Sequence, residues 1–129
     1  MILANMDTVG TFKMAVEMAR HQCVVAIHKH YTVDEWKAFV VEQPQAAPFV
    51  AASAGTSEAD LKKLDSILMA CPAVTCICLD VANGYSEAFV SVVKQVRERW
   101  PTHTIMAGNV VTNESTPPRQ YPSRAYSCF

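Results

Sequence analysis

The residue with the clearest chemical potential is an aspartate at the end of an apolar run. Asp80 follows Thr75-Cys76-Ile77-Cys78-Leu79 and precedes a turn of small residues. Buried parallel strands read as apolar runs, and in α/β enzymes ligands bind beyond the carboxyl ends of such strands. Asp80 is therefore placed to face a ligand. The alternative is that Asp80 only caps the next helix.

A lysine flanked by two histidines follows an earlier apolar run. Lys29 lies between His28 and His30, directly after Val24-Val25-Ala26-Ile27. If the strand continues through them, alternation places Lys29 on the face opposite to both histidines. A cation there can bind a cofactor phosphate or amide, and the alternative is a solvated lysine at a strand end. The two histidines could ligate a metal, but two ligands do not make a site, so we expect none.

Four apolar runs alternate with helical patterns, and these elements must position the side chains above. The runs begin about 25 to 28 residues apart, at Val24, Phe49, Thr75 and His103. The helical patterns cover residues 11–21, 33–41, 57–70 and 86–100. In the last pattern an apolar stripe has helical spacing: Phe89, Val92, Val93 and Val96. Such βα repetition predicts parallel strands with right-handed crossovers, in a partial TIM barrel or in a doubly wound sheet.

The length favours part of a barrel. A TIM barrel has eight βα units and ~250 residues, whereas these 129 residues hold about four units. We therefore expect an α/β fold in which helices cover one side of four strands. Residues 1–112 would form this domain. In residues 113–129, Pro117-Pro118 would stop a helix from propagating, so we expect an irregular or disordered tail.

Composition excludes several classes of function. The net charge of -1 gives no basic surface for nucleic acid or for an anionic membrane. No apolar run approaches the ~20 residues of a membrane span, and the first residues lack the basic region of a signal peptide. The five cysteines are an odd number and include no pair of CxxC motifs. These features predict a cytoplasmic protein without disulfides or a zinc site.

Four segments together resemble GMP reductase, within the superfamily that it shares with IMP dehydrogenase. The segments are Ala4-Asn5-Met6-Asp7-Thr8-Val9-Gly10, Ile27-His28-Lys29-His30-Tyr31, Leu79-Asp80-Val81-Ala82-Asn83-Gly84-Tyr85-Ser86-Glu87 and Ile105-Met106-Ala107-Gly108-Asn109-Val110-Val111-Thr112. Forms close to the first and fourth segments occur in both enzymes. The second and third segments separate the two enzymes, because IMP dehydrogenases carry different residues there. The resemblance ends near residue 114.

The resemblance implies a TIM barrel that converts GMP to IMP and ammonia with NADPH. In such enzymes a cysteine thiolate attacks C2 of the purine, and hydride transfer follows the loss of ammonia. The matching cofactor-binding positions are Lys29, Asp80, Val81 and Ala82. Met6 and Asn109 match residues near the purine nucleotide, although Met6 could instead pack in the core. The family also implies homo-oligomers and a monovalent cation such as potassium, bound at a site outside this chain.

The sequence also departs from the family pattern. By comparison with the family, we expect the first barrel strand to be absent at the amino end. The catalytic cysteine of the family lies in a Gly-x-Gly-x-x-Cys-Thr loop, which this sequence does not contain. Cys128 lacks the flanking glycines and threonine, and Ala88 replaces the usual histidine after Glu87. We therefore expect a GMP reductase chain that is incomplete and inactive alone, with no catalytic residue of its own. The alternative is a non-catalytic interaction fragment or an aberrant product of a GMP reductase gene. A small doubly wound nucleotide-binding domain is disfavoured, because no G-x-G-x-x-G or P-loop motif occurs.

Overall fold

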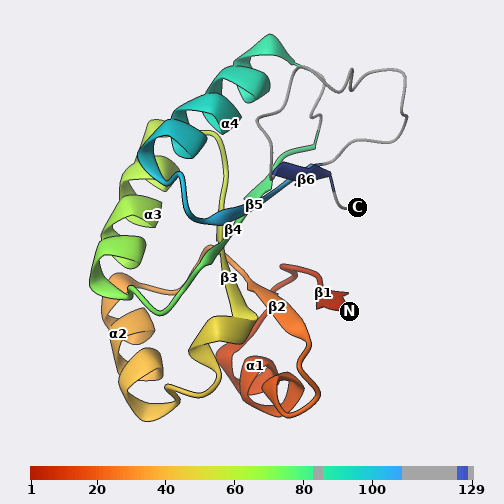
Figure 1. Ribbon diagram of the computed structural model, residues 1–129, viewed down its shortest axis with the longest axis vertical. Coiled ribbons are helices and arrows are strands. Elements are labelled where there is room, and N and C mark those ends of the chain that lie inside the picture. Colours follow the sequence, from red (N-terminus) through yellow and green to blue (C-terminus); the bar gives the residue numbers. More distant parts are fainter. Residues whose placement is uncertain (83–85, 109–124, 128–129) are drawn as a thin grey trace.

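The computed structural model describes residues 1–82, 86–108 and 125–127, which form a parallel sheet lined by helices (Figure 1). The strands are β1 (Ile2–Leu3), β2 (Val24–Ile27), β3 (Val50–Ala54), β4 (Cys76–Asp80), β5 (Thr104–Gly108) and β6 (Ala125–Ser127). The helices are α1 (Phe12–Ala19), α2 (Val33–Glu42), α3 (Glu58–Ala70) and α4 (Glu87–Arg99), with a 3₁₀ turn over Ala47–Phe49. None of the helices in the described ranges is long and apolar enough to cross a membrane.

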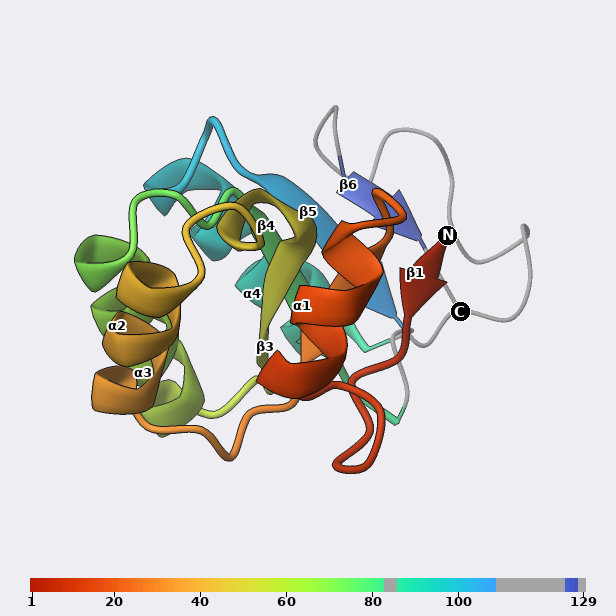
Figure 2. The same cartoon turned by 90° about the horizontal axis from the view of Figure 1, so that it is seen from below.

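The strands lie side by side in the order in which they occur along the chain. All pairs are parallel, from β1 beside β2 to β5 beside β6. The sheet curves, so that β1 and β6 lie on the same side of the molecule when it is seen from below (Figure 2). The chain therefore forms a half-barrel, as the βα spacing predicts.

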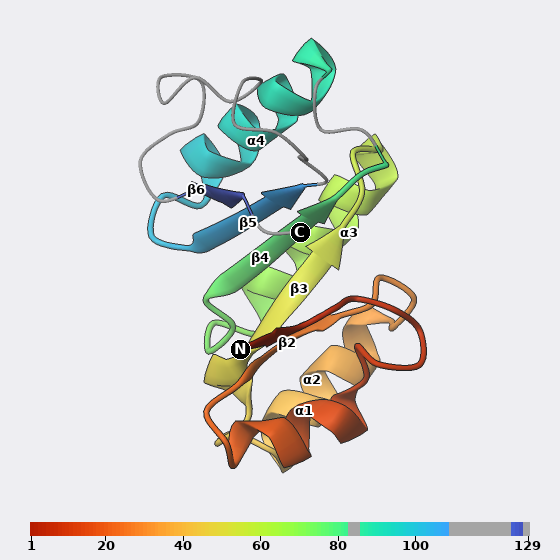
Figure 3. The ribbon, with the colours of Figure 1, turned by 90° about the vertical axis from the view of Figure 1, so that its right-hand side faces the viewer.

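The two faces of the sheet carry different side chains. On the convex face, alternate residues of the strands pack against the helices, which all lie on this side (Figure 3). Trp36 and Phe89 are the largest fully buried side chains of this layer. The concave face has a separate small cluster made of Ala26, Ala51, Cys78 and Met106. Because the helices cover only one face of the sheet, the doubly wound alternative is wrong.

A hydroxyl side chain begins each of the four helices. Thr11, Thr32, Ser57 and Ser86 accept a hydrogen bond from the backbone N–H three residues later. Thr32 also forms a capping box with Glu35, and the backbone hydrogen bond from Thr32 lowers the pKa of the Glu35 carboxyl. Ser86 caps α4, so the interpretation of Asp80 as a helix cap is wrong. Asp80 therefore belongs to the carboxyl end of β4 and not to the start of α4.

The structure corrects the sequence analysis at the amino end of the chain. We predicted that the first barrel strand is absent, but Ile2 and Leu3 pair in parallel with Val24 and Val25 as β1. Of the tail, residues 113–129, the structure describes only Ala125–Ser127, which pair with β5 as the short strand β6, so the irregular tail stays a prediction. Neither strand shows a clear period-two pattern, because each has only two or three residues. The domain boundary after residue 112 lies outside the described residues and stays a prediction.

Candidate functional site

A pocket of 210 Å³ opens at the carboxyl ends of β2, β3 and β4. The loop after β1 closes one side, and the turn after β2 closes another. Its lining residues are Asn5, Asp7, His28, Lys29, His30, Ser53, Ala54, Gly55 and Asp80. Parallel sheets bind ligands at this end, so the pocket lies where the sequence predicts a site. It brings together Lys29 and Asp80, which are 51 positions apart in the chain.

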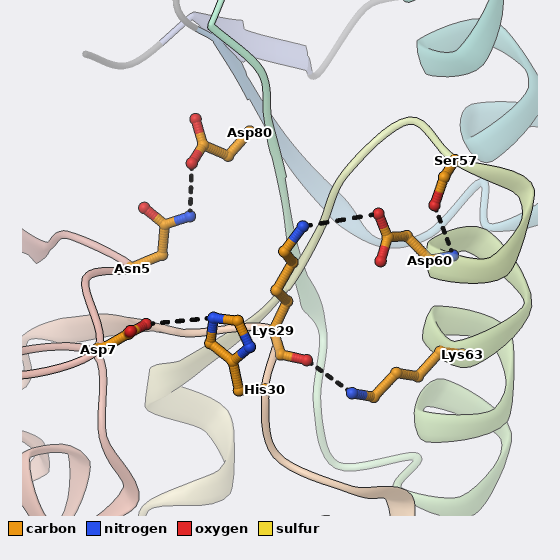
Figure 4. A network of polar contacts seen from close by, with 8 residues as sticks. All are labelled: Asn5, Asp7, Lys29, His30, Ser57, Asp60, Lys63 and Asp80. Atoms are coloured by element: carbon orange, nitrogen blue, oxygen red, sulfur yellow. Dashed lines mark hydrogen bonds and ion pairs between the residues drawn. The ribbon is translucent and has the colours of Figure 1, made fainter.

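Asp80 is the last residue of β4 and is held by the loop after β1. The Nδ2 of Asn5 donates a hydrogen bond of 2.9 Å to Oδ2 of Asp80 (Figure 4). Asn5 thereby restrains a side chain 75 positions further along the chain. Asp80 is exposed, so its carboxylate remains accessible to a ligand in the pocket.

Lys29 lies in a turn, and the first turns of α3 hold it there. Its Nζ is 3.9 Å from Oδ2 of Asp60, and Lys63 donates a 2.6 Å hydrogen bond to the Lys29 carbonyl (Figure 4). β2 ends at Ile27, so the strand does not continue through His28 and His30. Strand alternation does not apply in the turn and cannot fix the direction of Lys29 relative to the two histidines, and all three residues line the pocket.

The pocket carries more negative than positive charge. Two carboxylates, Asp7 and Asp80, line it together with the ammonium of Lys29. A third carboxylate, Asp60, already faces that ammonium. His30 Nε2 lies 3.3 Å from Asp7 Oδ1, so this histidine also faces a carboxylate. Such an arrangement repels a phosphate and suits uncharged groups that donate hydrogen bonds, such as a ribose or a carboxamide.

Ser53 and Gly55 form the inner wall of the pocket. Ser53 is 8% exposed, and its hydroxyl has no hydrogen-bond partner among the described residues. A Cβ atom at Gly55 would lie 2.5 Å from Oδ2 of Asp60, so a glycine leaves room for that carboxylate. The sequence analysis did not single out Asn5, Asp7 or Ser53. The available signal for Ser53 was a polar residue within the apolar run of β3.

The other predicted site residues contribute less to the pocket. Met6 is 61% exposed, which excludes the core-packing interpretation, and it does not line the pocket although both neighbours do. The Val81 N–H donates to the Gly108 carbonyl at 2.9 Å, and its side chain packs against the convex core. Ala82 is exposed beyond β4. Asn109 lies outside the described residues.

No cysteine of the described residues lines the pocket. Burial raises the pKa of the Cys71 thiol and of the Cys76 thiol, which disfavours the nucleophilic thiolate. Cys128 lies outside the described residues. Within the part of the chain that the structure describes, no cluster of three or more His, Cys, Asp or Glu side chains could hold a metal ion.

Comparison with known proteins identifies the family. The model of the IMP dehydrogenase / GMP reductase domain matches residues 1–118. The chain belongs to the IMP dehydrogenase / GMP reductase family. Within this family it is 59% identical over 113 residues to human "GMP reductase 1". It is 55% identical over 113 residues to "GMP reductase" of Phytophthora infestans. Each match covers 88% of this chain.

The chain spans about one third of the length of these curated relatives, with 33% of the human protein and 31% of the Phytophthora protein covered. The same holds for a matching solved structure. Inosine 5′ monophosphate dehydrogenase from Legionella pneumophila superposes with a TM-score of 0.75 and 29% sequence identity, over 88% of this chain and 34% of that one. The chain is therefore a partial chain relative to them, and its half-barrel matches part of the barrel of that enzyme.

Proposed function

We propose that this chain supplies the cofactor side of a GMP reductase active site. The reaction is the NADPH-dependent reductive deamination of GMP to IMP and ammonia. The observation that carries the proposal is the pocket at the carboxyl ends of β2 to β4, which gathers Lys29 and Asp80 from two different βα units. The identity of 59% to human GMP reductase 1 supports this reaction over that of IMP dehydrogenase.

The residues of the pocket fit the nicotinamide half of NADPH better than its phosphates. Asp80 would accept hydrogen bonds from the ribose hydroxyls or from the carboxamide NH₂ group. Lys29 would donate to an uncharged oxygen, because its charge already faces Asp60 at 3.9 Å. Phosphate groups would face Asp7 and Asp80 without a free cation in the described pocket. The binding roles of Val81, Ala82, Met6 and Asn109 remain predictions from the family resemblance.

When bound, NADPH supplies the hydride that reduces the purine. The chain's own residues bind and orient the nucleotide that carries this hydride. The Asn5 hydrogen bond fixes the direction of the Asp80 carboxylate, and α3 fixes the backbone of Lys29. Positioning of this kind lowers the entropic part of the barrier once both substrates are in place.

The 129-residue chain does not complete this reaction alone under our proposal. The chemistry needs a thiolate beside C2 of the purine. The printed sequence has no Gly-x-Gly-x-x-Cys-Thr loop, and no described cysteine reaches the pocket. The proposed activity therefore belongs to a complete barrel.

A chimaera tests the role of Asp80. In it, the 113 matched residues of this chain replace their counterparts in human GMP reductase 1. Asp80→Asn should raise the KM for NADPH about 10- to 100-fold, the effect of losing a charge-assisted hydrogen bond, and leave the KM for GMP within about 2-fold. Asp34→Asn is the matched control, because the Asp34 side chain is 92% exposed on α2. An effect confined to the KM for GMP would contradict the proposal.

A further inference from the structure

A serine hydroxyl lies buried at the base of the pocket. Ser53 follows Ala51 by two positions on β3, so it points to the same concave face of the sheet. In the register of the sheet it is paired with Cys78, two residues before Asp80. Ser53 therefore lies one pleat deeper in the half-barrel than the carboxylate of Asp80.

This hydroxyl has no partner among the described residues. Its Oγ is buried, and the residue is 8% exposed within a strand that is otherwise made of valine and alanine. Buried hydroxyl groups are normally hydrogen-bonded, because burial removes their contact with water. An alanine would fill the same strand position without leaving a polar atom unpaired. The serine is therefore better explained by a ligand than by the stability of the empty protein.

The surroundings of Ser53 define the chemistry of that ligand. The pocket that Ser53 lines is bordered by the carboxylates of Asp7 and Asp80, so an anionic group would be repelled there. A hydroxyl can donate one hydrogen bond and accept others. We propose that Ser53 is a binding residue for an uncharged hydrogen-bonding group in the nicotinamide-riboside half of the cofactor. This inference rests on the proposed function and adds a residue to the proposed site.

The experiment uses the 129-residue chain with Ser53→Ala, and ligand-observed NMR titrations measure its binding. NADPH is the main probe, and adenosine 2′,5′-bisphosphate tests the half of the cofactor without nicotinamide. GMP tests whether the group that hydrogen-bonds with Ser53 belongs to the purine substrate and not to the cofactor. Ser66→Ala is the matched control, because the Ser66 hydroxyl lies on the exposed side of α3 and bonds only its own helix in the described contacts.

We expect Ser53→Ala to raise the Kd for NADPH about 3- to 10-fold, the effect of losing one neutral hydrogen bond. The Kd values for adenosine 2′,5′-bisphosphate and GMP should not change. The melting temperature should stay equal or rise, because the substitution removes an unpaired polar atom. Ser53→Cys, which keeps a weak donor of similar size, should give a smaller increase in the Kd.

Three outcomes would overturn the inference. Unchanged NADPH binding would show that Ser53 does not contact the cofactor. A lower melting temperature in both variants would assign the hydroxyl to the stability of the sheet. A loss of affinity confined to GMP would assign the Ser53 hydroxyl to the binding of the purine substrate. If the unsubstituted chain binds no NADPH, the proposed function fails together with this inference, whereas tight binding that survives Ser53→Ala contradicts the inference alone.

Discussion

At the scale of single residues, the pocket depends on residues that are held in place by other elements of the fold. Asn5 orients Asp80, and Lys63 holds the backbone of Lys29. Neither restraint is an ion pair, and the adjacent Lys29–Asp60 pair is not buried, because its side chains are 51% and 26% exposed. Exposed pairs contribute little to stability, so these contacts set geometry more than they hold the fold together.

His103 makes the stability of the chain depend on pH. Burial lowers the pKa of its imidazole below the ordinary value of 6.5, and the nearby Arg97 guanidinium lowers it further, against the effect of a hydrogen bond with the Val74 backbone. Below about pH 6.5 the His103 imidazole is therefore protonated in the unfolded chain, whereas in the folded chain it stays neutral down to a lower pH. The stability that the chain gains by keeping His103 neutral is fully present above pH 6.5. It is lost as the pH falls through the lower pKa of the imidazole in the folded state.

The variant His103→Gln tests this dependence in urea unfolding between pH 7.5 and pH 5. The free energy of unfolding of the unsubstituted chain should fall over this range, and that of the variant should fall less. Both chains keep the same carboxylates, so the difference between the two slopes isolates the imidazole. Equal slopes would show that His103 does not resist protonation in the folded state.

At the scale of elements, the loop after β1 is fitted closely against β2. A Cβ atom at Gly10 would lie 2.3 Å from the backbone carbonyl oxygen of Ala26. The Gly10 carbonyl also accepts a 2.9 Å hydrogen bond from the His28 N–H. This contact places Asn5 and Asp7 over the carboxyl ends of the strands, where they line the pocket.

We predict that Gly10→Ala destabilises the chain by about 1–3 kcal/mol, because the backbone of β2 has to move. Gly55→Ala is a matched comparison. Its added Cβ would meet the carboxylate end of Asp60, a side chain that can rotate away. It should cost less than Gly10→Ala in chemical denaturation. An equal or smaller loss for Gly10→Ala would contradict the close approach of the loop.

Elements with a regular apolar period could be predicted from the sequence, whereas contacts between residues far apart in the chain could not. The apolar stripe of α4 predicted its buried side, because Phe89, Val93 and Val96 are buried. The apolar run Val24–Ile27 coincides with β2, but the directions of the side chains in the turn after it could not be predicted, because strand alternation ends there. The Asn5 contact with Asp80 joins residues 75 positions apart and leaves no local pattern. The serine in β3 was visible, but its lack of a partner appears only in the folded chain.

At the scale of the whole molecule, the half-barrel has two strands at its edges, β1 and β6. β6 lies beyond residues 1–118, which match the family. Backbone groups on open edges pair readily with other chains. The chain also spans one third of its curated relatives. The open edges and the partial coverage both fit a chain that forms one part of a barrel.

The most direct test of this account is the GMP-dependent oxidation of NADPH, followed for the 129-residue chain and for the chimaera with human GMP reductase 1. We predict that the chimaera oxidises NADPH only when GMP is present, and that the chain alone does not. A folded chimaera that oxidises no NADPH would contradict the assignment of the cofactor side of the site to this chain. GMP-dependent oxidation by the purified chain alone would contradict the claim that catalysis needs a complete barrel.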